Sequence, residues 1–73
     1  MNDLMVQSEI GGSVWKILVK PGDRIAEEEP IMILESMKME IPVLAPGAGT
    51  VHEIKVEEGQ VVAEGDLVAI IKA

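Results

Sequence analysis

Residues 34–41 hold a lysine whose neighbours suggest chemistry, because it stands between two methionines. Lys38 carries a primary amine, and Met37 and Met39 place a large apolar side chain on either side of it. Apolar segments lead into this run and out of it, as in a β-hairpin. The tip of a short hairpin usually carries Asn, Asp or Gly, which tolerate the turn. Methionine and lysine there indicate a segment that presents its side chains to another molecule.

The other residues that could do chemistry favour structural roles. His52 has no metal-ligating side chains in a suitable pattern around it, so we expect no metal-binding or catalytic role for it. Trp15 is expected to pack, with contact to a partner as the alternative. The glutamate runs at 27–29 and 57–58 are interpreted as solvated turns. The sequence therefore predicts neither catalytic residues nor a metal site.

An internal repeat organises the chain. When the sequence is shifted by 37 positions, residues 5–36 align with residues 42–73, and nine positions are identical. A composition rich in Val, Ile, Gly and Glu would give roughly two to three identities by chance. The clearest stretch sets Gly12–Val19 over Gly49–Val56. Two copies are too few for a solenoid, so we expect one closed domain over residues 1–73 with a pseudo-twofold axis.

Each copy consists of short apolar segments between turn residues. The predicted strands are Val6, 14–19, Ile25 and 31–34 in the first copy, and Val43, 51–56, 61–62 and 67–71 in the second. Gly, Pro and Asp separate them at short spacing, which leaves no room for a helix of three turns and predicts an all-β sandwich or barrel. Val14 and Ile17 are three residues apart, as are Val51 and Ile54, so we expect a bend or bulge in both copies.

The hairpin at 35–40 joins the two copies. Residue 38 corresponds to residue 1 in one direction and to a position past the end of the chain in the other. The axis therefore places this hairpin at one end of the domain and both termini at the other. A surface lysine is ordinarily just solvated, and methionine ordinarily fills gaps in a core. Neither ordinary role explains why two methionines bracket Lys38 at this point.

Composition and charge exclude several classes of protein. The 73 residues carry 13 Asp and Glu against 6 Lys and Arg, and this net charge of −7 argues against binding to nucleic acid or to anionic membranes. The absence of cysteine excludes disulfides and Cys-based metal sites. A domain this small buries only about 60% of its unfolded surface, which leaves little chain for a catalytic cleft. Without a signal-peptide pattern or an apolar run of about 20 residues, we expect a cytoplasmic protein that does not insert into membranes.

Residues 35–40, Glu-Ser-Met-Lys-Met-Glu, resemble the attachment motif of biotinyl domains, the carrier modules of biotin-dependent carboxylases. That motif is usually Glu-Ala-Met-Lys-Met, and its lysine carries biotin. The resemblance covers nearly the whole chain and includes Gly12–Ile17, Val19–Asp23, 45–46 and 49–51. It implies a flattened β-barrel or sandwich of two four-stranded antiparallel sheets with quasi-twofold symmetry, and biotin attached to Lys38.

One position departs from this pattern. Biotinyl domains commonly have alanine where this chain has Ser36, and the related lipoyl domains use a motif like Glu-Ser/Thr-Asp-Lys-Ala. Glu35 and Ser36 therefore also match the lipoyl pattern, whereas Met37 and Met39, which adjoin the lysine, favour biotin. Attachment of lipoate, alone or in addition, stays open. An unmodified β-barrel interaction module is the remaining alternative.

The resemblance implies a carrier and not an enzyme. A biotin protein ligase would join activated biotin to the Lys38 amine as an amide. A biotin carboxylase would then load the cofactor, and a carboxyltransferase would discharge it. The residues that the ligase and the partner enzymes would recognise are Glu35, Ser36, Met37, Met39 and Glu40. The carrier itself is expected to be monomeric, without a catalytic residue or a metal.

Overall fold

The computed structural model describes residues 3–73, and these residues contain eight β-strands. They are β1 (Asp3–Gln7), β2 (Gly12–Ile17), β3 (Arg24–Ile25), β4 (Pro30–Ser36), β5 (Met39–Leu44), β6 (Gly49–Ile54), β7 (Val61–Val62) and β8 (Leu67–Lys72). These residues contain no helix that is long and apolar enough to span a membrane.

The strands form two antiparallel sheets of four strands each. We call the sheet with the order β5-β4-β2-β7 the hairpin sheet and the sheet with the order β1-β8-β6-β3 the terminal sheet. Each sheet takes two strands from each copy of the repeat, so neither copy forms a unit by itself. This arrangement confirms the predicted all-β fold of two four-stranded sheets.

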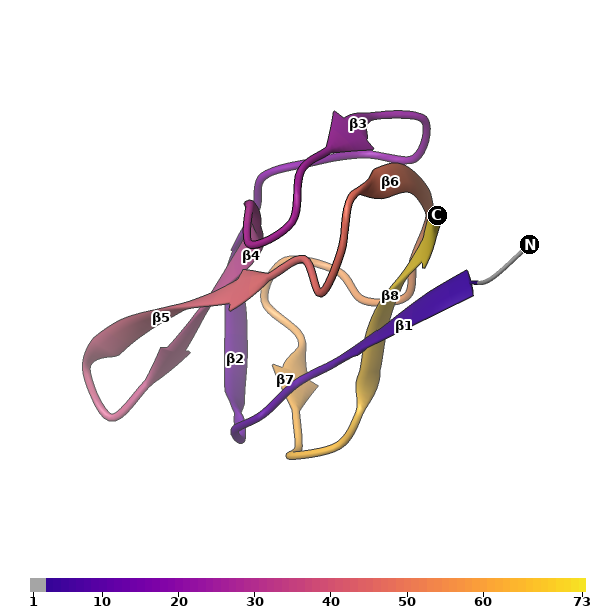
Figure 1. The fold of residues 1–73 in the computed structure, drawn as a ribbon. Helices are drawn as coiled ribbons and strands as arrows, with labels where there is room; N and C mark the ends of the chain where they lie inside the picture. Colours follow the sequence, from indigo (N-terminus) through magenta and orange to yellow (C-terminus); the bar gives the residue numbers. More distant parts are fainter. Residues whose placement is uncertain (1–2) are drawn as a thin grey trace.

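The molecule is elongated, with extents of 36 × 19 × 18 Å. The β4–β5 hairpin projects at one end, while the start of β1 and the end of β8 lie together at the other (Figure 1). Asp3 pairs with Lys72 there. The opposite placement of the hairpin and the termini is the one predicted from the repeat.

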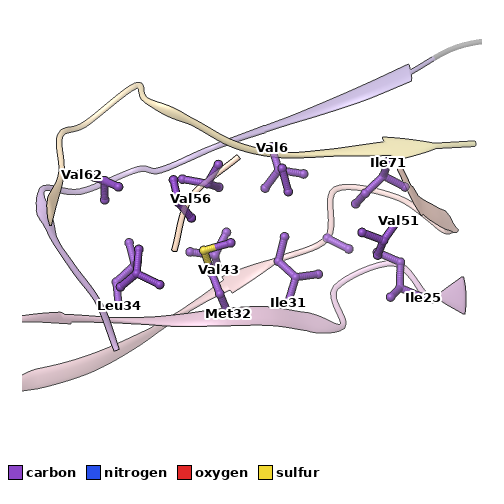
Figure 2. Close-up of a cluster of buried hydrophobic side chains, with 14 residues drawn as sticks. Val6, Ile25, Ile31, Met32, Leu34, Val43, Val51, Val56, Val62 and Ile71 are labelled. Carbon is purple, nitrogen blue, oxygen red and sulfur yellow. The ribbon is translucent and has the colours of Figure 1, made fainter. Parts of the chain in front are cut away.

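The hydrophobic core lies between the two sheets. Side chains from both sheets point toward one another across this space (Figure 2). The buried apolar residues are Val6, Val14, Ile25, Ile31, Met32, Leu34, Val43, Ala45, Val51, Val56, Val62, Val68, Ala69 and Ile71. Most of them form pairs 37 positions apart, such as Leu34 with Ile71, because both copies bury the same face of each strand.

The backbone hydrogen bonds repeat with the same offset as the sequence. The Gly22 amide donates to the Val51 carbonyl over 2.8 Å, and the equivalent Gly59 amide donates to the Val14 carbonyl over 2.6 Å. Both glycines have a positive φ, 98° and 91°, in turns that therefore require glycine. Equivalent backbone hydrogen bonds therefore join the two copies in both directions, as expected of a pseudo-twofold pair.

A bulge interrupts β2 and β6 at equivalent places, and this confirms the predicted irregularity. The pairing of β2 with β4 shifts between Val14 and Lys16, and the pairing of β6 with β8 shifts between Val51 and Glu53. The extra residue lets Val14 stay buried and Ile17 pack against the core. Both strands end earlier than predicted, at residues 17 and 54 instead of 19 and 56, because the chain then turns away from the ladder.

The acidic turns were interpreted from the sequence as solvated. They also form hydrogen bonds with the backbone. Glu29 Oε1 accepts a hydrogen bond from the Ala26 amide at 2.8 Å, and Glu58 Oε2 accepts one from the Ile17 amide at 2.9 Å. The first of these closes a turn locally, whereas the second joins two distant segments. The runs at 27–29 and 57–58 are exposed, yet one glutamate of each accepts a hydrogen bond from a backbone amide.

Candidate functional site

The candidate site is the tip of the β4–β5 hairpin. Ser36 pairs with Met39, so the connection between the strands consists of Met37 and Lys38 alone. On the β2 side the last pair is Ser13 with Glu35. Beyond it the hairpin is held only by the pairing of its own two strands, and it projects from the body of the molecule (Figure 1). Lys38 therefore lies at the tip of a short, two-stranded projection.

The turn has a backbone that its two residues do not favour. Met37 has a φ of 52° and Lys38 a φ of 66°, both in the left-handed region. Two-residue hairpin turns need this conformation because it matches the twist of the strands, and Asn-Gly is the sequence that adopts it most readily. For an ordinary L-residue it costs roughly 1–2 kcal/mol. The tip thus carries residues suited to presentation and poorly suited to the turn.

The side chains at the tip face solvent. Met37 is 92% exposed and Met39 is 60% exposed, and Lys38 is exposed between them. Within residues 3–73, the Lys38 ammonium takes part in no hydrogen bond or salt bridge; the described salt bridge joins Lys55 to Glu53 at 3.1 Å. The amine is therefore open to an incoming molecule from several directions.

The strand register divides four of the five predicted recognition residues between two faces. Glu35 pairs with Glu40, and both project from the outer face of the hairpin sheet, because the neighbouring Leu34 projects into the core. Ser36 and Met39 project from the opposite face. Met37 belongs to the turn. The hairpin thus has an acidic outer face and a thioether on its inner face.

Gly12 fixes the base of the hairpin, and the sequence interpretation missed it as a positioning residue. A Cβ at this position would lie 2.7 Å from the Glu35 carbonyl oxygen and 3.3 Å from Ser36 Cβ. Only glycine lets β2 approach β4 this closely. The signal was present in the repeat, where Gly12 aligns with Gly49; a Cβ there would clash with the Lys72 carbonyl oxygen.

Trp15 and His52 were considered as functional residues outside the hairpin. Trp15 was expected to pack, but its side chain is 49% exposed at the β2 bulge, so this prediction is wrong. Trp15 follows the buried Val14, so strand alternation places it on the outer face of the hairpin sheet. His52 occupies the equivalent bulge on β6 and is exposed. A surface groove lies between the 7–10 connection and β5, and Lys38 is not one of the residues that line it.

The fold and the hairpin together define a class: a small β domain of two four-stranded sheets that offers one lysine on a projecting two-residue turn. A family model described as "Biotin-requiring enzyme" matches residues 5–71. The chain therefore belongs to the biotin/lipoyl attachment family.

Known proteins show the same relationship. The Biotin/lipoyl attachment protein of Bacillus subtilis is 47% identical over 64 residues, which cover 88% of this chain and 88% of that protein. The Biotin carboxyl carrier protein of Streptococcus mutans is 51% identical over 55 residues, 75% of this chain and 42% of that one. The crystal structure of Kluyveromyces lactis urea carboxylase superposes with a TM-score of 0.93 at 35% identity, over 99% of this chain and 6% of that chain.

Proposed function

We propose that this protein is a biotin carboxyl carrier module and that biotin is attached to Lys38. The observation that carries the proposal is the placement of a solvent-exposed lysine, between two exposed methionines, on the two-residue turn of the projecting hairpin. Membership of the biotin/lipoyl family supports it. So do the similarities to a biotin carboxyl carrier protein and to a carboxylase.

The residues present fit a covalently attached biotin. Attachment requires a primary amine that an enzyme can surround, and the described residues leave Lys38 free of internal partners. A biotin protein ligase supplies biotinyl-AMP; the Lys38 Nζ attacks its acyl carbon, an amide forms, AMP leaves and the amine loses its proton. Because no described side chain forms a hydrogen bond or salt bridge with the amine, we assign the removal of that proton to the ligase.

The carrier acts by position and not by catalysis. Once attached, the cofactor supplies a site that carries a carboxyl group between a biotin carboxylase and a carboxyltransferase. The stiff hairpin holds the attachment point away from the body of the domain, so the attached group can enter an enzyme's active site while the domain remains outside. Tethering also raises the effective concentration of the group at each active site.

Lipoate is a second candidate for the same lysine. Glu35 and Ser36 match the lipoyl pattern, and a relative that is 47% identical is named a biotin/lipoyl attachment protein. Met37 and Met39 argue for biotin as the main cofactor. Their exposed thioethers are flexible and can pack against differently shaped surfaces, which suits a hairpin that meets a ligase and two further enzymes in turn.

Intact-mass spectrometry after incubation with a biotin protein ligase, biotin and ATP tests the proposal. We expect the wild-type protein to gain the mass of one biotinyl group, and Lys38→Ala to gain none. Lys20→Ala removes an exposed lysine that lies outside both sheets and should be modified like the wild type. A wild-type protein that stays unmodified by an active ligase, or a Lys38→Ala protein that is modified, contradicts the proposal. Parallel reactions with lipoate and a lipoate ligase measure the second candidate.

A further inference from the structure

The outer face of the hairpin sheet carries an apolar patch that the core does not need. Trp15 follows the buried Val14 and therefore projects outward, and the bulge in β2 keeps Lys16 on the same face, opposite Ile33 of β4. Ile33 in turn pairs with the exposed Pro42 of β5. On the other side of β2, Val61 of β7 pairs with Ser13, diagonal to Trp15, and is 76% exposed. We call Trp15, Ile33, Pro42 and Val61 the Trp15 patch.

The internal repeat supplies a control for this patch. The equivalent positions on the terminal sheet are His52, Ile70, Met5 and Arg24. Each of them has the same burial class as its counterpart, so the fold places the same demands on both faces. The terminal sheet nevertheless carries histidine and arginine where the hairpin sheet carries Trp15 and Val61. The apolar character of the Trp15 patch is therefore not a requirement of folding, and exposed patches of this kind mark interaction surfaces.

The charges beside the patch define what can cover it. Glu35 and Glu40 lie on the same outer face, one row nearer the hairpin tip, and Lys16 lies opposite Ile33 within the patch. Glu58 lies in the turn that approaches the end of β2, and the protein as a whole has a charge of −7. A complementary surface is apolar at its centre, where tryptophan is a frequent source of binding energy, and carries Arg or Lys on the side toward the tip.

The length of the lysine side chain indicates which enzyme needs this surface. A lysine reaches only about 6 Å from its Cα. The enzyme that acts on the free amine must therefore bring its active site up to the hairpin and contact the domain itself. Five residues separate Lys38 from Ile33, about 17 Å along the strand. An interface of about 800 Å² per partner is about 32 Å across, so one interface can include both the tip and Ile33. Enzymes that act after attachment meet a longer arm and can remain farther away.

We propose that the Trp15 patch is the docking surface for the biotin protein ligase, which covers it with an apolar surface bordered by Arg or Lys. This proposal rests on the proposed function of Lys38. It assigns to Trp15 and Val61 a contribution to ligase binding, while the tip residues present the amine. Loss of the patch then raises the KM for the carrier and leaves kcat unchanged, because the hairpin itself is not altered.

Exchange of residues between the two sheets tests the proposal. Trp15→His together with Val61→Arg gives the hairpin sheet the residues of the terminal sheet. We expect the KM for biotinylation to rise at least tenfold, with an unchanged kcat and an unchanged Tm. The matched control, His52→Trp with Arg24→Val, builds the same side chains on the terminal sheet. It should keep the wild-type KM, because that face is turned away from the ligase.

A competition assay measures docking without the chemistry. Lys38→Ala cannot be modified but retains the patch, so it should inhibit biotinylation of the wild-type protein. Adding Trp15→His and Val61→Arg should raise its inhibition constant at least tenfold. Val61→Thr keeps the side-chain shape and is the second variant to use if the double exchange perturbs folding. It should give a smaller rise in the inhibition constant.

The outcomes separate this proposal from the proposed function. If the wild-type protein is not biotinylated, the function assigned to Lys38 is wrong. If it is biotinylated but the exchanged variant keeps a KM and an inhibition constant within twofold of its parent, the docking surface is wrong and the function stands. A variant that is biotinylated normally but fails to accept carboxyl groups from a biotin carboxylase would assign the patch to that enzyme and overturn the proposal.

Discussion

Two cross-strand pairs at opposite ends of the molecule occupy equivalent places in the repeat but carry different charges. At the terminal end Asp3 pairs with Lys72, and at the hairpin end Glu40 pairs with Glu35, each 37 positions from its counterpart. Opposite charges attract across strands, whereas like charges directly opposite each other destabilise a sheet. The terminal end therefore follows the rule for a stable ladder, and the hairpin end breaks it.

The backbone conformation also distinguishes the hairpin end from the terminal end. The hairpin tip holds Met37 and Lys38 in the left-handed region, where other sequences would have asparagine and glycine. Violations of local preference are expected where function constrains a sequence. Charge and backbone thus agree that the hairpin end was shaped by what it must present, while the charge pair at the terminal end follows the preference of a stable ladder.

The largest expected effect comes from the two glycines that let the strands approach at each end. We expect Gly49→Ala to lower the free energy of unfolding by about 3 kcal/mol and Gly12→Ala by about 2 kcal/mol, because each new Cβ meets a carbonyl oxygen of the neighbouring strand. Chemical denaturation measures both. Gly11→Ala is the control, since its Cβ would meet its nearest atom at an ordinary 3.7 Å.

The same variants sharpen the difference between the ends. At a temperature where both variants are folded, Gly12→Ala should slow biotinylation, because it displaces the Glu35 backbone at the base of the hairpin. Gly49→Ala should not, because it acts at the terminal end. Equal rates of biotinylation for the two variants would show that the position of the hairpin base does not matter to the ligase.

A smaller effect is expected from relief of the strained tip. Met37→Asn with Lys38→Gly installs the preferred turn sequence and should raise the free energy of unfolding by about 2 kcal/mol, measured by denaturation. Glu28→Gly is a matched comparison, because Glu28 has a φ of 67° in a turn whose counterpart is Gly65. It should stabilise the protein by less, and it should leave biotinylation unchanged. A tip variant no more stable than the wild type would mean that the turn is not strained.

The smallest expected effect tests the two charge pairs. Glu35→Lys should stabilise the protein by about 0.5 kcal/mol, and Lys72→Glu should destabilise it by about the same amount. Both effects should disappear at high salt, where exposed charges are screened. Glu35→Lys should also slow biotinylation, whereas Lys72→Glu should not. Stability changes of the same sign in both variants would contradict the contrast between the two ends.

Much of the fold could be predicted because the residues that determine it occur in both copies of the repeat. The apolar pairs at 14 and 51 and at 34 and 71, the turn glycines and the two bulges are all visible as matches or as shared irregularities. The exposure of Trp15 was predicted wrongly. Alternation along β2 places Trp15 on the outer face of the sheet, because the neighbouring Val14 is buried. How much of that face the neighbouring strands cover depends on pairing between distant segments, which residue type and spacing do not specify.

The amino-acid sequence by itself determined the two-copy architecture, the point where the copies join and the presence there of Lys38 between two methionines, because these depend on residue type and spacing. The tertiary structure decided which residues share a face. Strand register placed Glu35 opposite Glu40 and separated both from Met39, and it assembled Trp15, Ile33, Pro42 and Val61 from four strands into one patch. Such groupings arise from pairing between distant segments, and that pairing is fixed only when the two sheets close around a common core.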